Sequence, residues 1–254
     1  MNSRHYEKLE VRHYADRETL GRAAADHVRG IVAAARAARG VARVVFACAP
    51  SQNEFFRALV APPHTVPWAD VIVFHSDEFV GLSASQPQSS RHYLRAHLLD
   101  AIPAPHGFHA LRGEAPSLPA ECERYALLLR ERPIDLVCLG LGGKGHIAFN
   151  DPAAANFDDA EMVKVVELDE VSREQQVHDG CFAREKDVPT HALTLTIPAL
   201  FSARAISCIA AGPRKAGAVQ ATASGPILEA CPASILRAHP NAVLHIDAEA
   251  AAKL

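Results

Sequence analysis

The chain has 254 residues, of which 49% are hydrophobic and 22% are charged, and its formal net charge at pH 7 is −3. This is ordinary globular composition, which excludes a disordered chain, and the small, scattered charge excludes a basic surface for nucleic acid or an anionic membrane. No apolar run reaches the roughly 20 residues that span a bilayer, and no two of the six cysteines have the CxxC spacing of a zinc or redox site.

Residues 1–10 are polar and lack the apolar segment of a secretory signal, so we expect a cytoplasmic protein. Helical spacing of apolar residues then predicts helices at 19–38, 53–60, 89–99, 120–130 and about 216–224. Compact apolar runs predict strands at 41–47, 71–74, 134–141, 191–197, 205–211 and 242–246.

Strands that alternate with helices indicate βα units. We therefore expect an α/β fold, a Rossmann-like doubly wound, mostly parallel sheet with helices on both faces. No internal repeat or linker interrupts the pattern, so one domain over residues 1–254 is expected. In such sheets ligands collect at the carboxyl ends of the strands. The ends with unusual chemistry are 47–53, 74–81, 141–151 and 211–215.

Glycines crowd residues 140–145, which allows a close approach of backbone to ligand, and His146 follows with Asp151 nearby. A histidine beside a carboxylate can hold one tautomer and move protons near neutral pH. The same residues also fit a histidine that is simply bonded to a loop carbonyl.

Adjacent acids, Asp77 and Glu78, follow the 71–74 strand. We expect one to face inward as a general base and the other to be a solvated carboxylate. The alternative is a helix N-cap or a simple turn.

The other two strand ends carry groups that could hold an anion. Arg214 and Lys215 stand where a strand ends and a helix begins, a place that favours phosphate, although a solvated surface charge is the commoner fate of a lysine. Residues 48–52 (CAPSQ) offer hydroxyl and amide donors without glycine, which makes the phosphate signal of this loop modest.

Taken together, these segments resemble the glucosamine-6-phosphate deaminase family, within the wider group that includes 6-phosphogluconolactonases. The resemblance runs from about residue 17 to residue 247. It rests on SDEFVGL (76–82) and GHIAFNDP (145–152), with support from VPTHALTLTIPAL (188–200), GPRKA (212–216) and PASILRAHPN (232–241). The lactonase branch typically continues Thr-Ala-Ser-Leu-Phe-Pro after its glycine–histidine pair, whereas residues 147–150 read IAFN, as in the deaminase branch.

The resemblance implies conversion of glucosamine 6-phosphate to fructose 6-phosphate and ammonia, with no metal and no organic cofactor. It implies that Asp77 moves a proton between C1 and C2 and that His146 helps to open the sugar ring. Asp151 falls where the family has a glutamate that supports this histidine. The implied contacts to substrate or phosphate are those of Ser51, Gln52, Lys144, Gly145, Arg173 and Lys215.

The sequence also departs from the family pattern. Lys144 stands two positions before His146, where the family usually has an aspartate, and CAPSQ replaces a loop like Thr-Gly-Ser-Thr-Pro. The family's phosphate-binding arginine has no clear match near residues 180–181, which leaves Arg173 or Arg184 as substitutes.

These departures keep two alternatives open. One is an enzyme for another phosphorylated substrate, such as galactosamine 6-phosphate or 6-phosphogluconolactone. The other is a non-catalytic sugar-phosphate sensor. The expected partner is in each case a small sugar phosphate, and the sequence leaves a homo-oligomer open.

Overall fold

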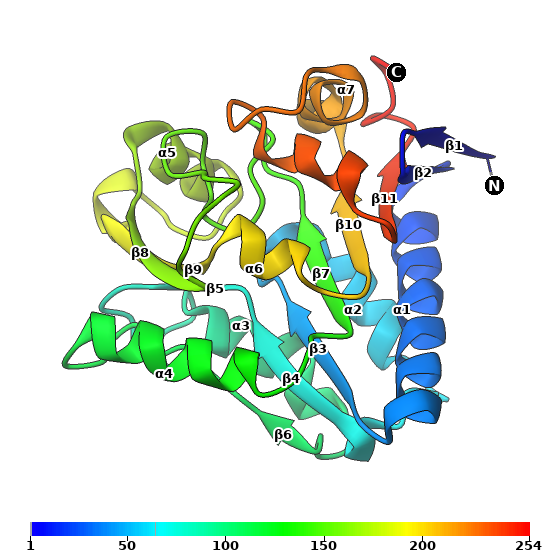
Figure 1. Ribbon diagram of the computed structural model, residues 1–254. Coiled ribbons are helices and arrows are strands. Elements are labelled where there is room, and N and C mark those ends of the chain that lie inside the picture. Colours follow the sequence, from blue (N-terminus) through cyan, green and yellow to red (C-terminus); the bar gives the residue numbers. More distant parts are fainter. Residues whose placement is uncertain (1, 64) are drawn as a thin grey trace.

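The computed structural model describes residues 2–63 and 65–254. Its main sheet has eight strands in the order β1-β2-β11-β10-β7-β3-β4-β6 (Figure 1). They are β1 (Asn2–Tyr6), β2 (Leu9–Tyr14), β11 (Ala242–Asp247), β10 (Ile206–Ala210), β7 (Leu136–Gly140), β3 (Ala42–Phe46), β4 (Val71–His75) and β6 (Gly107–Phe108). All neighbouring pairs are parallel except the β1–β2 hairpin.

Helices cover both faces of this sheet, as predicted. On one face, Val44 and Leu136 pack with residues of α1 (Arg17–Arg39), α2 (Asn53–Val60) and α3 (Ser90–His97). On the other face, Val45 and Val137 pack with residues of α4 (Leu118–Arg130), α6 (Ile197–Phe201) and α7 (Ala216–Ser224). Successive strand residues point to opposite faces, so each buried strand contributes to two cores, which is why the strands read as continuous apolar runs.

The longest helix, α1, shows how the sequence sets an element's limits. The Asp16 side chain accepts a hydrogen bond from the Thr19 backbone N–H, an N-cap, and Gly40 with φ of 81° follows the last turn. Leu20, Ala24 and Val28 are buried at helical spacing. Figure 1 shows the helix running along one side of the sheet, with both chain termini at the β1 edge.

A second, three-stranded antiparallel sheet has the order β5-β9-β8, formed by β5 (Asp77–Phe79), β9 (His191–Leu195) and β8 (Val163–Glu167). The strand expected at 191–197 therefore exists, but it lies outside the parallel sheet. Short β5 follows β4 after one residue, so it carries the chain from the main sheet into the smaller one. Helix α5 (Glu170–His178) follows β8.

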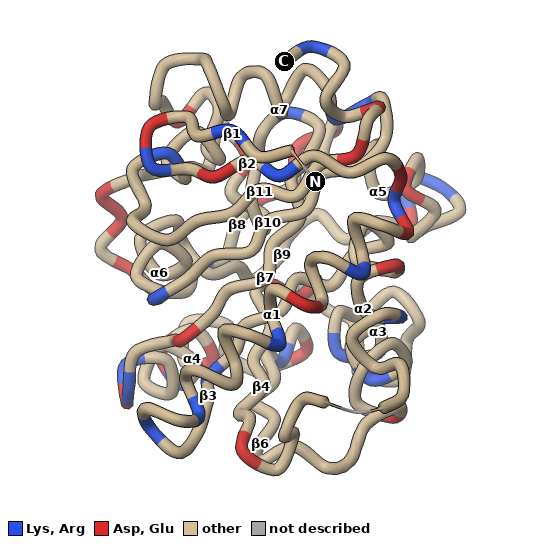
Figure 2. The backbone as a smooth tube through the Cα atoms, turned by 90° about the vertical axis from the view of Figure 1, so that its right-hand side faces the viewer, with Lys and Arg blue, Asp and Glu red and all other residues tan. Residues whose placement is uncertain are grey.

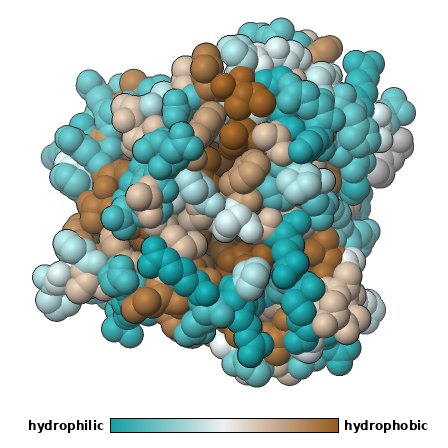
Figure 3. All heavy atoms as spheres, viewed as in Figure 1, coloured by the Kyte–Doolittle hydropathy of each residue, from teal (hydrophilic) through white to brown (hydrophobic). Residues whose placement is uncertain are grey.

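Among the described residues, no helix combines the length and the apolar composition needed to cross a membrane. Lys and Arg residues are interspersed with Asp and Glu residues along the chain (Figure 2). Hydrophilic residues are likewise spread between smaller apolar areas on the face drawn in Figure 3.

Candidate active site

The four strand ends singled out in the sequence converge on one cavity of about 740 Å³. Residues of segments 47–53, 77–79, 140–149 and 211–215 line it, together with part of α5 and the turn that follows. It lies where the chain order reverses, since β3 pairs with β4 on one side and with β7 on the other. Crevices at such switch points are the usual ligand sites of parallel sheets, and this volume suits a small ligand.

Asp77 is the buried acid of the cavity. Its Oδ2 accepts a hydrogen bond of 2.6 Å from the Ser76 hydroxyl, and its Oδ1 lies 3.4 Å from the Ser90 hydroxyl. Burial raises the pKa of Asp77 to about 6, and the negative charge of Glu78 acts in the same direction against the two hydroxyls and His146. Such a carboxylate is ionised at neutral pH yet retains a proton affinity suited to a general base.

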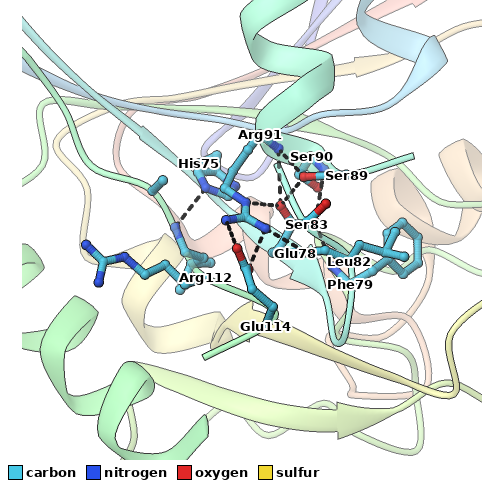
Figure 4. A network of polar contacts seen from close by, with 12 residues as sticks. His75, Glu78, Phe79, Leu82, Ser83, Ser89, Ser90, Arg91, Arg112 and Glu114 are labelled. Carbon is cyan, nitrogen blue, oxygen red and sulfur yellow. Dashed lines mark hydrogen bonds and ion pairs between the residues drawn. The ribbon is translucent and has the colours of Figure 1, made fainter. Parts of the chain in front are cut away.

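Glu78 corrects the expectation of a solvated neighbour, because its side chain is 0% exposed. Figure 4 shows its carboxylate held by the Arg91 guanidinium, with Nε 2.9 Å from Oε2, and by the Ser89 hydroxyl at 2.7 Å. Arg91 also pairs with Glu114. The network fastens β5 to the start of α3, where Ser90 contacts Asp77. Glu78 is thus a structural group beneath the catalytic candidate.

His146 lies in the cavity wall with its Nδ1 2.7 Å from Oδ1 of Asp151. The other carboxylate oxygen of Asp151 accepts a hydrogen bond of 2.7 Å from the Ser172 hydroxyl. Burial alone would raise the pKa of Asp151, but His146 and Ser172 outweigh it and hold that pKa below its usual value. With Nδ1 turned toward Asp151, Nε2 is the nitrogen left for a ligand.

A cationic group and a hydroxyl group also line the cavity. Lys215 is half-buried, and burial lowers its pKa. In the part of the chain that the structure describes, no carboxylate forms an ion pair with Lys215, whereas neighbouring Arg214 lies 3.4 Å from Asp179. Ser51 lines the same cavity. A partly desolvated ammonium that is not held in a direct ion pair favours an anionic ligand.

Four expected contact residues do not line the cavity. Gln52 is fully buried and donates to the Leu139 carbonyl oxygen, while Gly145, with φ of 78°, packs against Cys231. The Lys144 ammonium lies 3.4 Å from Asp169 at the surface. Arg173 pairs with Glu185, and the substitute Arg184 pairs with Asp187.

Other cavity residues escaped the sequence analysis. Among them are Arg17, Ser90, Tyr93, Gln175 and His178. Arg17 follows β2, a strand that the sequence analysis did not predict. The Tyr93 hydroxyl donates to the Ala49 carbonyl oxygen at 2.7 Å, which supports the loop that carries Ser51.

Comparison with known proteins agrees with this arrangement. Residues 15–245 match the sequence model of the family described as "Glucosamine-6-phosphate isomerases/6-phosphogluconolactonase". The chain belongs to this family of enzymes. The resemblance inferred from the motifs is thereby confirmed.

Members of the glucosamine-6-phosphate isomerase/6-phosphogluconolactonase family include relatives named glucosamine-6-phosphate deaminase. One from Listeria welshimeri is 40% identical over 73% of this chain and 76% of its own length. One from Streptococcus pneumoniae is 36% identical over 84% of this chain and 87% of its own length.

Among solved structures of the family, a monomeric glucosamine-6-phosphate deaminase has a TM-score of 0.89 at 28% identity. The match covers 96% of this chain and 99% of the deaminase. The 6-phosphogluconolactonase from Trypanosoma brucei has a TM-score of 0.78 at 19% identity, and the match covers 96% of this chain and 98% of the lactonase. The latter likeness shows the shared fold alone.

Proposed function

We propose that the protein converts glucosamine 6-phosphate to fructose 6-phosphate and ammonia. The observation that carries this proposal is one cavity lined by a buried carboxylate with a pKa of about 6, an imidazole backed by a carboxylate, and an ammonium that forms no ion pair with a carboxylate of the described residues. Relatives 36–40% identical that are named glucosamine-6-phosphate deaminase support the choice of substrate.

The chemistry follows from these three groups. The Lys215 ammonium, with Ser51, holds the phosphate, whose binding energy orients the reacting carbons. His146, oriented by Asp151, transfers the proton that opens the ring at its oxygen. Asp77 as carboxylate takes the proton from C2 while a proton passes from the substrate's own ammonium group to the C1 oxygen. Asp77 then returns its proton to C1, which leaves a hydroxymethyl group at C1 and an iminium at C2. Water adds to that carbon and ammonia leaves, so no redox step or external electron acceptor is required.

This assignment makes the protein both an isomerase and, in its use of water, a hydrolase of amino-sugar metabolism. We place Asp77, His146 and Asp151 in the catalytic group, and Ser51 and Lys215 in the phosphate group. Gln52 and Gly145 act by shaping the loops behind the cavity. Lys144 and Arg173 reach substrate only through a rearrangement of side chains that are now paired with Asp169 and Glu185.

We further propose that residues 1–254 form one domain, because β1 near the start and β11 near the end lie in the same sheet. A cytoplasmic location is supported by six cysteines that are all free thiols.

The test is a substrate panel with purified protein: glucosamine 6-phosphate, galactosamine 6-phosphate and 6-phosphogluconolactone. Ammonia and fructose 6-phosphate are measured for the first two, and lactone hydrolysis for the third. The highest kcat/KM is expected with glucosamine 6-phosphate. A preference for another member identifies a different substrate, and binding without turnover across the panel identifies a sensor.

A further inference from the structure

Ser172 lies at a junction between helix α5 and the imidazole of the cavity. It is the third residue of α5 and is 5% exposed. Its hydroxyl donates to Oδ2 of Asp151 at 2.7 Å, while Oδ1 of the same carboxylate lies 2.7 Å from Nδ1 of His146. The Ser172 hydroxyl thus hydrogen-bonds the carboxylate whose other oxygen contacts the imidazole.

We propose that Ser172 is a positioning residue that fixes the orientation and tautomer of His146 through Asp151. Its catalytic consequence rests on the proposed function, whereas its effect on the imidazole does not. Asp151 is buried, so an oxygen that loses its donor cannot be satisfied by bulk water. The carboxyl group would then rotate or take up a proton, and the partner of Nδ1 would no longer be fixed.

The surroundings of Ser172 hold it in place for this role. Its backbone N–H donates to the side chain of Asp169, the N-cap of α5, at 2.7 Å. The second oxygen of Asp169 lies 3.4 Å from the Lys144 ammonium, two residues before His146. The start of α5 is therefore joined to the segment 141–151 at two points, Asp169 to Lys144 and Ser172 to Asp151.

Helix α5 also supplies Gln175, Gln176 and His178 to the cavity lining. The hydrogen bond from Ser172 to Asp151 therefore couples two things that catalysis needs, the docking of these lining residues and the orientation of the imidazole. The spacing from Ser172 to Gln175 and Gln176 puts them one turn apart on the same side of the helix.

The experiment compares Ser172→Ala with Ser172→Thr, which keeps the hydroxyl, and with Val171→Ala, an exposed neighbour on the same turn. In the first readout, kcat and KM for glucosamine 6-phosphate are measured across pH. Removal of one buried hydrogen bond to a charged group predicts a loss in kcat of about 10- to 100-fold for Ser172→Ala with little change in KM. Ser172→Thr should retain most of the wild-type kcat, and Val171→Ala all of it.

The second readout needs no substrate. The ¹⁵N shifts of the His146 ring, assigned with His146→Gln, report the tautomer of the neutral imidazole. Wild type and Ser172→Thr should show the Nδ1–H form, and Ser172→Ala a mixture. Circular dichroism establishes that each variant is folded, and Ser172→Cys, with its weaker donor, replaces Ser172→Ala should that variant fail to fold.

An unchanged tautomer in the folded variant that lacks the hydroxyl overturns the proposal, as does an unchanged kcat in an enzyme whose wild type turns over. A wild type inactive on the whole panel overturns the proposed function instead, and the tautomer measurement then decides the role of Ser172 by itself.

Discussion

The imidazole of His146 occupies the space that a side chain at Gly142 would need. A Cβ built on Gly142 would lie 2.0 Å from Nε2 of the ring. The first glycine after Leu141 is therefore required by the histidine four residues later. The glycine-rich turn, expected from the sequence to let the backbone approach a ligand, at this position makes room for an imidazole.

Replacement of Gly142 by alanine should displace this ring. A displacement on the order of 1 Å in a reacting group can cost roughly 100-fold in rate, and we expect a loss of that size in kcat. The control is Gly143→Ala, where the nearest atom to the new Cβ is 3.6 Å away, an ordinary contact. Equal kcat values for the two variants would show that the position of the ring is not limiting.

The pH dependence should report the environment of Asp77. Because burial raises its pKa to about 6, the carboxylate needed as base is lost when pH falls through that value, so kcat/KM should fall below about pH 6. Ser76→Ala removes a hydrogen bond that favours the ionised form of Asp77. The pH at which kcat/KM falls should therefore move to a higher value. Ser202→Ala, whose hydroxyl donates to the Ala199 carbonyl oxygen, is the control and should leave it unchanged.

Lys215→Met should weaken phosphate binding. An interaction between charged groups is worth about 1.5–3 kcal/mol, so KM should rise roughly 10- to 100-fold, with a smaller change in kcat. Lys253→Ala removes an exposed lysine near the C-terminus and serves as the control for net charge. Steady-state kinetics with varied glucosamine 6-phosphate make the comparison. A KM unaltered by Lys215→Met places the phosphate elsewhere, with Arg17 or Arg214 as the next cations to replace.

Arg91→Met should destabilise the fold, since it leaves the buried carboxylate of Glu78 without its counter-charge. Removal of one partner of a buried pair typically costs about 3–5 kcal/mol. Arg36→Ala, which breaks an exposed pair with Asp70, should cost less than about 1 kcal/mol. Urea unfolding measures both free energies. Similar values for the two variants would show that the network in Figure 4 contributes no more than a surface pair.

Sequence patterns predicted the parallel sheet well because each of its central strands is buried on both faces. The runs at 41–47, 134–141 and 205–211 are mostly apolar, and the polar segments that follow them meet at one edge as the topology requires. Strand β9 was predicted but assigned to the wrong sheet, since alternation at 191–197 indicates a strand but not the sheet that it joins.

The edge elements were missed where local patterns are weak. Strands β1 and β6 are short or exposed, and β5 has three residues, so neither length nor alternation marks them. Lys144 and Arg173 were expected at the substrate because of their chain positions, yet each lies beside an acid that only the fold brings near, Asp169 and Glu185. Ser172 gave no signal, because its partner Asp151 is 21 residues away.

The most direct test of the account is the activity of Asp77→Asn, which keeps the shape of the side chain and removes the base. Folding raises the pKa of Asp77 from 3.8 to about 6. The contribution of this side chain to protein stability is therefore fully present below about pH 4, where it is protonated, and is lost as pH rises through 6. At pH 8 the variant should therefore be folded and more stable than wild type, by up to roughly 3 kcal/mol. The account predicts that this folded variant yields no ammonia and no fructose 6-phosphate from glucosamine 6-phosphate above background, whereas wild type yields both. Wild-type rates in Asp77→Asn would contradict it.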